Sequence, residues 1–99
     1  MWYAIRGHDA ADALAQRRGA RASHLARLEA LLGAGRLLVA GPLPAIDSAE
    51  PGPAGFVGSL VIAHFASLEE ARTWADADPY LVASAWTHVE VNPFVPVLP

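Results

Sequence analysis

The chain contains no cysteine and no lysine among its 99 residues. Without cysteine it has no disulfide, no thiolate zinc site and no cysteine nucleophile. Its seven cationic side chains are all arginine, and ten acidic residues outnumber them, so the net charge is −3. A chain this poor in positive charge does not suit a phosphate backbone, and we expect no nucleic-acid partner.

Long apolar runs are also missing. No run approaches the roughly 20 residues that a membrane-spanning helix needs. The first residues, Met1–Arg6, lack the basic head, the long apolar stretch and the small-residue cleavage site of a signal peptide. We therefore predict a cytoplasmic protein that makes no contact with a membrane.

Apolar residues make up 54% of the chain, which is enough for a hydrophobic core. Residues 1–99 have the length of a single domain, because domains commonly run to about 100–150 residues. The apolar share is high for so small a globule, most of whose residues lie near the surface. This surplus predicts a second buried surface, and a homodimer is the simplest way to bury it.

The pattern of apolar and turn-forming residues predicts the order strand, helix, strand, strand, helix, strand. The predicted strands are residues 2–6, 36–41, 56–65 and 86–91, and the predicted helices are residues 13–32 and 67–75. Asp9 or Asp12 is expected to cap the first helix, and Ser67 with Glu70 to form the capping box of the second. Residues 42–55 carry four prolines and are expected to form a long loop, of a kind that is often functional.

This order predicts an α+β fold, a ferredoxin-like βαββαβ unit with an antiparallel sheet and helices on one face. Strand 56–65 is apolar on both faces, so the face that the helices leave open needs a cover. The sheet of a second subunit would provide it, which is the arrangement of a dimeric α+β barrel. The proline-punctuated tail, residues 94–99, is expected to extend along the partner.

His24 is the first candidate for chemistry. It lies in the middle of the first predicted helix, where helical spacing puts Arg21, Arg27 and Leu28 beside it. We expect it half-buried at the border of a leucine stripe, with nearby cations that favour the neutral imidazole needed by a general base. A histidine that only hydrogen-bonds a backbone group fits the same spacing, and is the commoner case.

Asp78 is the second candidate. It precedes Pro79 at the start of a short predicted helical turn, which is an ordinary capping position. Its carboxylate could also orient His24 and stabilise the charged imidazole, as in other His–Asp pairs. The two roles are compatible, and the sequence leaves both open.

Three further residues are candidates for binding a small molecule. Arg21 and Arg27 could hold an anionic group, since a guanidinium matches carboxylate and phenolate oxygens. Ser59, in strand 56–65, either lines a pocket with its hydroxyl or fills a small packing position. The sequence does not decide between these two interpretations of Ser59.

The four histidines, His8, His24, His64 and His88, raise the question of a metal. No two of them have the three- or four-residue spacing of a helical metal pair. Only convergence of distant residues in the fold would build a metal site, so we predict no metal and no cofactor. Whether His8, His64 or His88 joins the pocket of His24 stays open.

Six stretches resemble the YciI-like (YCII-related) family and together cover nearly the whole chain in order. They are RASHLARL (21–28), RLLVAGPLPAID (36–47), AGFVGS (54–59), SLEEA (67–71), WADADPY (74–80) and VEVNPF (89–94). The resemblance implies a ferredoxin-like fold, a dimeric α+β barrel, and a pocket whose functional residues fall on His24 and Asp78. One departure is that residues 83–85 read Ala-Ser-Ala where the family has a glycine, which implies a stiffer backbone or a smaller pocket.

The resemblance also implies a direction for function, because a related enzyme is a dehydrochlorinase of chloroaromatic breakdown. We therefore expect a small cofactor-independent enzyme that uses His24 and Asp78 for acid–base chemistry on an aromatic or carbonyl-bearing molecule. The alternative is a non-catalytic dimer that binds a small ligand or regulates through the same pocket. A haem- or oxygen-using relative on the same barrel is a third interpretation, because one fold hosts many chemistries.

Overall fold

The computed structural model describes all residues from Met1 to Pro99. The chain forms four strands and three α-helices in the order β1 (Trp2–Asp9), α1 (Leu14–Gly33), β2 (Leu37–Pro44), β3 (Phe56–His64), α2 (Leu68–Asp76), α3 (Pro79–Val82) and β4 (Trp86–Phe94), with a 3₁₀ turn at Gly52–Ala54. None of the helices has the length and apolar character needed to cross a membrane.

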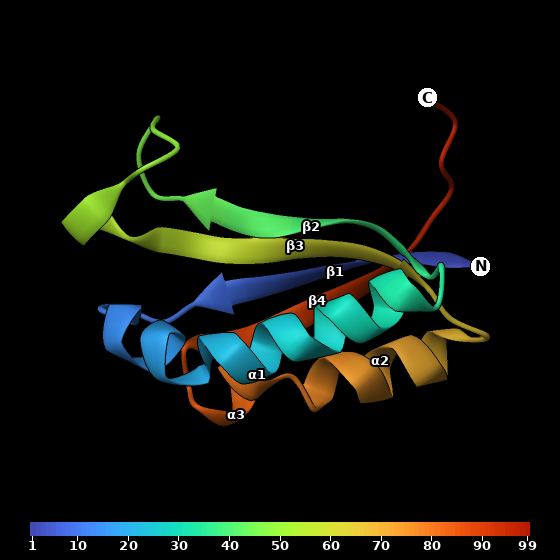
Figure 1. Ribbon diagram of the computed structural model, residues 1–99, viewed down its shortest axis with the longest axis horizontal. Coiled ribbons are helices and arrows are strands. Elements are labelled where there is room, and N and C mark those ends of the chain that lie inside the picture. Colours follow the sequence, from blue (N-terminus) through green and yellow to red (C-terminus); the bar gives the residue numbers. More distant parts are fainter.

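The strands form one antiparallel sheet in the order β2-β3-β1-β4, and all three helices cover the same face of it (Figure 1). This strand order is the ferredoxin-like arrangement, so the predicted α+β fold class is confirmed. The two central strands are β3 and β1, and the two edge strands are β2 and β4.

The core lies between the sheet and the helices. Alternate residues of the central strands point into it, and Ile5, Val61 and Ala63 are almost fully buried there. Their alternation follows from the two-residue repeat of a strand, which sends successive side chains to opposite faces. The helices meet them with small residues such as Ala71 and Ala75, neither of which is exposed to solvent, so α2 packs close to the sheet.

The opposite face of the sheet has no helix over it. Ile62 lies between Val39 of β2 and Ala4 of β1 in the sheet register, so these three side chains form an apolar row across that open face. The C-terminal tail leaves the end of β4 and extends away from the body of the molecule (Figure 1), and its Val95, Val97 and Leu98 are exposed.

Strand β2 runs three residues past its predicted end and includes Pro42 and Pro44, which were expected in the loop. Proline lacks the N–H that a central strand uses, but an edge strand tolerates it because one of its sides has no neighbour. The same argument covers Pro93, which lies inside β4, the other edge strand. The connection from β2 to β3 is correspondingly shorter than predicted.

The predicted cap of α1 by Asp9 or Asp12 is wrong. The residue before α1 is Ala13, and no side chain caps this end. Asp12 has φ 55, and Asp9 instead pairs with Arg17, one turn into the helix. Half of the predicted capping box of α2 is present, because Ser67 Oγ accepts a hydrogen bond from the Glu70 backbone N–H at 3.1 Å. The Glu70 carboxylate accepts from the backbone N–H of Ala66 at 3.0 Å and not from that of Ser67.

Candidate functional site

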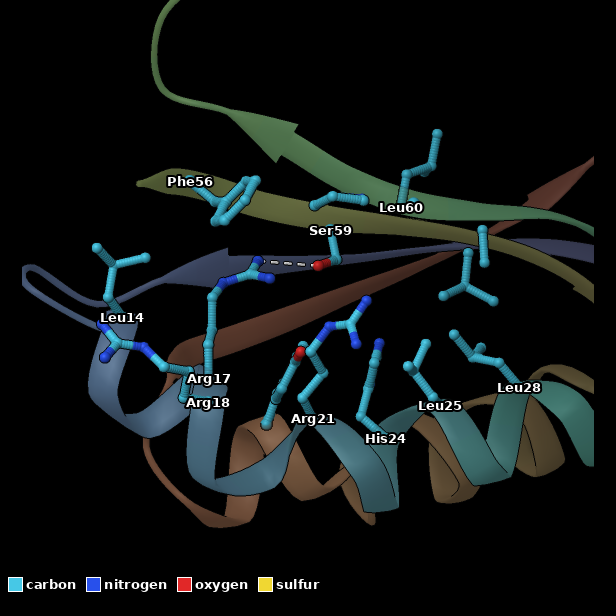
Figure 2. A pocket seen from close by; sticks show the side chains of 15 residues that line it. Leu14, Arg17, Arg18, Arg21, His24, Leu25, Leu28, Phe56, Ser59 and Leu60 are labelled. Carbon is cyan, nitrogen blue, oxygen red and sulfur yellow. Dashed lines mark hydrogen bonds between the residues drawn. The ribbon is translucent and has the colours of Figure 1, made fainter. Parts of the chain in front are cut away.

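A cavity of about 410 Å³ lies between α1 and the strands β2 and β3, with α3 at its base. Helix α1 supplies one wall, because residues at three- and four-residue spacing share one side of a helix. Figure 2 shows Arg17, Arg21 and His24 rising from successive turns of α1 toward the sheet. The polar and charged residues of the lining are Arg17, Arg18, Arg21, His24, Ser59 and Tyr80.

The predicted leucine stripe of α1 faces the cavity and forms part of its wall. The side of α1 that is buried against the rest of the protein is adjacent to this stripe. Leu14, Leu25 and Leu28 line the cavity, whereas Leu32 is 62% exposed. The buried side of α1 consists of Arg17, Ala20, His24, Leu28 and Leu31. His24 is therefore buried, at 5% exposure, and not half-buried at a border as the spacing had predicted.

His24 and Asp78 meet inside the protein. The Nδ1 atom of His24 lies 2.9 Å and 3.0 Å from the two carboxylate oxygens of Asp78. A carboxylate accepts hydrogen bonds, so Nδ1 carries the proton and donates it. The neutral imidazole then has its free electron pair on Nε2, which is the arrangement of a base held ready by a carboxylate.

Asp78 is completely buried and serves two neighbours at once. Its Oδ1 accepts a hydrogen bond from the Tyr80 backbone N–H at 2.9 Å, which caps α3, while the same carboxylate accepts from His24. The guanidinium of Arg27 approaches Oδ2 from another side, with Nη1 at 3.7 Å. One carboxylate thus makes both of the contacts that the sequence left open.

Aromatic rings fix the plane of the imidazole. The ring of His24 stacks on Tyr80 with centroids 4.0 Å apart, and the edge of Trp86 meets it at 5.7 Å. Trp86 in turn packs on Gly7, where a Cβ atom would fall 2.2 Å from the indole ring. Gly7 is therefore needed for Trp86 to reach His24.

Arg17 is a site residue that the sequence analysis missed. Its guanidinium is clamped by Asp9 at 2.7 and 2.8 Å and donates to Ser59 Oγ and Gly58 O, both at 2.9 Å, and the dashed line in Figure 2 marks the bond to Ser59. Ser59 is buried and lines the cavity, and its hydroxyl is a hydrogen-bond partner of Arg17 there. The four-residue spacing between Arg17 and Arg21 was the signal in the sequence that placed Arg17 on this wall.

The hydroxyl of Tyr80 faces these cations. Burial raises the pKa of Tyr80, and the nearby charges of Arg17 and Arg21 oppose the shift. Tyr80 is therefore neutral at physiological pH and can donate its hydroxyl proton.

The remaining arginines divide into two groups. Arg18 and Arg21 line the cavity and have no carboxylate within 4.0 Å, so their charges are free for a ligand. Arg27 does not line it. Its Nη2 donates to the Trp74 carbonyl at 2.6 Å and its guanidinium lies over the Trp74 ring, while burial lowers its pKa and Asp78 opposes that shift.

The other three histidines lie outside the cavity lining. His64 Nε2 lies 2.7 Å from the N-terminal amine of Met1. His8 and His88, from β1 and β4, come together with Glu90, and their potential ligand atoms all lie within 4.8 Å of one another. This is the convergence of distant residues that a metal site in this chain requires.

The strand order and the cavity define a ferredoxin-like α+β protein whose buried His–Asp pair faces an arginine-rich pocket. The family model described as the YCII-related domain matches residues 1–95. The chain belongs to the YCII-related family, as the resemblance predicted.

The curated relatives agree with this assignment. "Protein YciI" of Escherichia coli O6:H1 and that of Shigella flexneri are each 57% identical over 94 residues, spanning 95% of this chain and 96% of the relative. An uncharacterized protein of Haemophilus influenzae is 48% identical over the same shares. Among solved structures, 5-chloro-2-hydroxyhydroquinone dehydrochlorinase (TftG) from Burkholderia phenoliruptrix, in complex with 2,5-dihydroxybenzoquinone, has a TM-score of 0.83 and 25% identity, covering 97% of this chain and 95% of that one.

Proposed function

We propose that this protein is a small, cofactor-independent enzyme that removes a proton from an anionic ring compound, in a lyase-like or dehydrochlorinase-like reaction. The observation that carries the proposal is the Nδ1 hydrogen bond of His24 to the buried Asp78, inside a cavity that His24 itself lines. This arrangement leaves Nε2 as the only ring nitrogen free to accept a proton. His24 is the general base in the proposed mechanism.

Asp78 is the residue that positions and stabilises this base. When Nε2 takes up a proton the imidazole becomes a cation, and the adjacent, fully buried carboxylate of Asp78 compensates that charge. The imidazolium can then return its proton to the leaving group, which is how one histidine serves as base and acid in succession. Arg27 Nη1 lies 3.7 Å from Asp78 Oδ2 and Arg27 does not line the cavity, so we assign it to Asp78 and not to the substrate.

Arg18 and Arg21 define the substrate class. Both line the cavity, neither has an acidic partner, and both stand on the same helix as His24. A phenolate or carboxylate group of the substrate would pair with them and set the reacting atom against Nε2. The volume of about 410 Å³ and the mainly apolar remaining lining suit a single ring.

The structural neighbour supports a ring compound of this kind. TftG is a 5-chloro-2-hydroxyhydroquinone dehydrochlorinase, and the solved complex holds 2,5-dihydroxybenzoquinone. Its reaction class, loss of hydrogen chloride from a hydroxylated ring, requires a base and needs no redox cofactor. Hydroxylated quinones and chlorinated hydroquinones are therefore the first compounds to test here.

We further propose that the working unit is a homodimer joined through the open sheet face. The apolar row of Val39, Ile62 and Ala4 lies on that face with no helix over it. A second copy would cover this row by packing its own sheet against it, in the manner of two sheets face to face. The exposed tail of residues 95–99 is available to extend along that second copy.

The test measures binding and turnover separately. The wild type is titrated with 2,5-dihydroxybenzoquinone by calorimetry, and chloride release from chlorinated hydroquinones is followed by ion chromatography. The variant His24→Gln should bind with nearly wild-type affinity, because its amide can still donate to Asp78, yet turn over at least about 100-fold more slowly because an amide takes up no proton. His64→Gln, which alters a histidine outside the cavity, should keep full activity.

Arg21→Gln tests substrate binding. It should weaken binding of 2,5-dihydroxybenzoquinone at least about tenfold, because it removes one unpaired cation from the cavity. Arg72→Gln is the matched control, since Arg72 is exposed on α2 and does not line the cavity. Binding without turnover in the wild type would favour the non-catalytic binding protein, and equal turnover by wild type and His24→Gln would remove His24 from the mechanism.

A further inference from the structure

We propose that His8, His88 and Glu90 form a second site, which binds one divalent cation of the zinc type. The three residues lie on the open face of the sheet, His8 on the central strand β1 and His88 and Glu90 on the edge strand β4, and none of them lines the cavity of His24. His8 and His88 are 80 residues apart in the chain. They meet because β1 and β4 are neighbours in the sheet. This site is independent of the proposed acid–base function.

The register of the two strands brings the ligands to one side of the sheet. His8 is paired directly with His88, and Glu90 follows two residues later on β4, so all three side chains share a face. Their candidate ligand atoms lie within 4.8 Å of one another, and His8 Nε2 is in hydrogen-bond contact with the Glu90 carboxylate. The imidazole rings stack in parallel with centroids 4.3 Å apart, so one ring must rotate about its side-chain bonds before both nitrogens face the same ion.

A β-bulge supports this arrangement. His8 pairs with His88, but the next residue of β1, Asp9, pairs with Trp86. Thr87 is therefore an extra residue in β4 that has no partner in β1. Such bulges bend a strand and re-aim its side chains, and they are common beside functional sites. Here the bulge places the Thr87 hydroxyl between His8 and His88.

Thr87 holds His88 in the form that binds a metal. Its hydroxyl donates to the His8 carbonyl at 3.4 Å, so it accepts at 2.8 Å from the Nδ1–H of His88. The electron pair of His88 then lies on Nε2, which has no partner of its own. A metal-bound histidine characteristically donates its other ring N–H to a neighbouring oxygen in this way.

The donor set selects the kind of ion. Two imidazole nitrogens and one carboxylate are the ligands of many zinc sites, with a fourth position left for water or another group. Calcium and magnesium prefer oxygen donors alone. Arg6 lies opposite Glu90 in the register but makes no ion pair with it, so the carboxylate is available to the cation.

A cation at this point would tie β1 to β4 one residue before Asp9. Asp9 clamps Arg17, whose guanidinium forms part of the cavity wall. The proposed ion would therefore stiffen the strand end that carries this clamp.

The test uses the untagged full-length protein near neutral pH. Titration with Zn²⁺ by calorimetry should give one ion per chain, and Co²⁺ should develop the visible absorption of a four-coordinate site. His88→Ala and Glu90→Gln should each lower the affinity at least about tenfold, and Thr87→Val about tenfold through the lost orientation of His88. Zn²⁺ should also raise the melting temperature of the wild type more than that of His88→Ala.

His64→Ala is the matched control, because His64 is another strand histidine and its nearest nitrogen partner is the N-terminal amine. It should bind Zn²⁺ as the wild type does. The proposal is overturned if the wild type binds no stoichiometric Zn²⁺, if His88→Ala binds with unchanged affinity, or if His64→Ala abolishes binding. His88 and Glu90, the site residues that are substituted, are exposed on the edge strand β4, so circular dichroism should report a wild-type fold for each variant.

Discussion

At the scale of single residues, Asp78 makes the decisive contacts. One fully buried carboxylate caps α3, accepts from His24 and faces Arg27. A buried charge is tolerable only when it is paired and hydrogen-bonded, and these three contacts meet that requirement. The capping role and the proposed catalytic role of Asp78 are separable by mutation, because only the catalytic role needs the negative charge.

Asp78→Asn should leave α3 capped and impair catalysis. Asparagine caps helices about as well as aspartate, but it offers His24 no negative charge and can impose the wrong tautomer. Turnover should fall at least about 100-fold, while the free energy of unfolding falls by about 1–3 kcal/mol because His24 and Arg27 lose a charged partner. Chemical denaturation and single-turnover kinetics measure the two effects.

Asp76→Asn is the control for that experiment, since Asp76 is exposed two residues earlier. It should leave stability and turnover near wild type. If Asp78→Asn keeps wild-type turnover once its folded fraction is taken into account, Asp78 is only a cap.

Tyr80 makes stability depend on pH in the alkaline range. Burial raises the pKa of Tyr80 in the folded protein, so the folded state favours the neutral phenol more than the unfolded state does. The stabilisation from neutral Tyr80 is fully present below the unfolded value of about 10 and is lost as the pH rises through the higher folded pKa. Tyr80→Phe should therefore lose less stability than the wild type between about pH 9 and about pH 11.

Thermal unfolding of both proteins across that range supplies the comparison. Other groups also titrate there, so the informative quantity is the difference between the two melting curves. Parallel losses in the wild type and in Tyr80→Phe would contradict the raised pKa.

At the scale of elements, the turn from α3 into β4 is strained. Ser84 has φ 61, a left-handed conformation that costs a residue with a Cβ atom about 1–2 kcal/mol. The resemblance to the family implied a glycine in this segment, and the backbone geometry gives the physical reason, because glycine adopts this conformation freely. The turn delivers Trp86 to the edge of the His24 ring.

Ser84→Gly should raise the free energy of unfolding by up to about 1 kcal/mol, since relief of strain exceeds the extra entropy of glycine in the unfolded chain. Ala83→Gly, one residue earlier at φ −81, should instead destabilise the protein, because alanine is unstrained there. Urea denaturation of the two variants gives the comparison. A loss of stability in Ser84→Gly as large as that in Ala83→Gly would contradict strain at Ser84.

At the scale of the whole molecule, one sheet face is covered and the other is not. Helices cover the face that contains Ile5, Val61 and Ala63 (Figure 1), while Val39, at 52% exposure, faces away from them. Ile62 is already only 9% exposed, so the apolar surface that a second copy would remove from water in this row is mainly that of Val39. The proposed homodimer therefore depends on this face and not on the helical layer.

Val39→Glu should convert the proposed dimer into a monomer at micromolar concentration, because it would place an unpaired charge inside the interface. Val82→Glu is the control, since Val82 is 75% exposed on α3, on the helical side. Sedimentation equilibrium should find that this control stays dimeric. A monomeric wild type, or a dimeric Val39→Glu, would rule out association through the open sheet face.

The sequence by itself determined the order of elements, the fold class and the family, because these depend on local periodicity, on turn residues and on short motifs spread along the chain. It also singled out His24 and Asp78. It misjudged the burial of His24 and the extent of β2, since helical spacing alone does not reveal which side of α1 packs and edge strands admit proline.

Only the tertiary structure decided which distant residues meet. Asp78 reaches His24 across 54 positions and Arg17 reaches Ser59 across 42, while Arg27 turns away from the cavity toward Trp74. His8 meets His88 and Glu90 because two strands from opposite ends of the chain are neighbours in one sheet. Such contacts are set by the strand order and register of the folded chain, and spacing along the sequence carries no record of them.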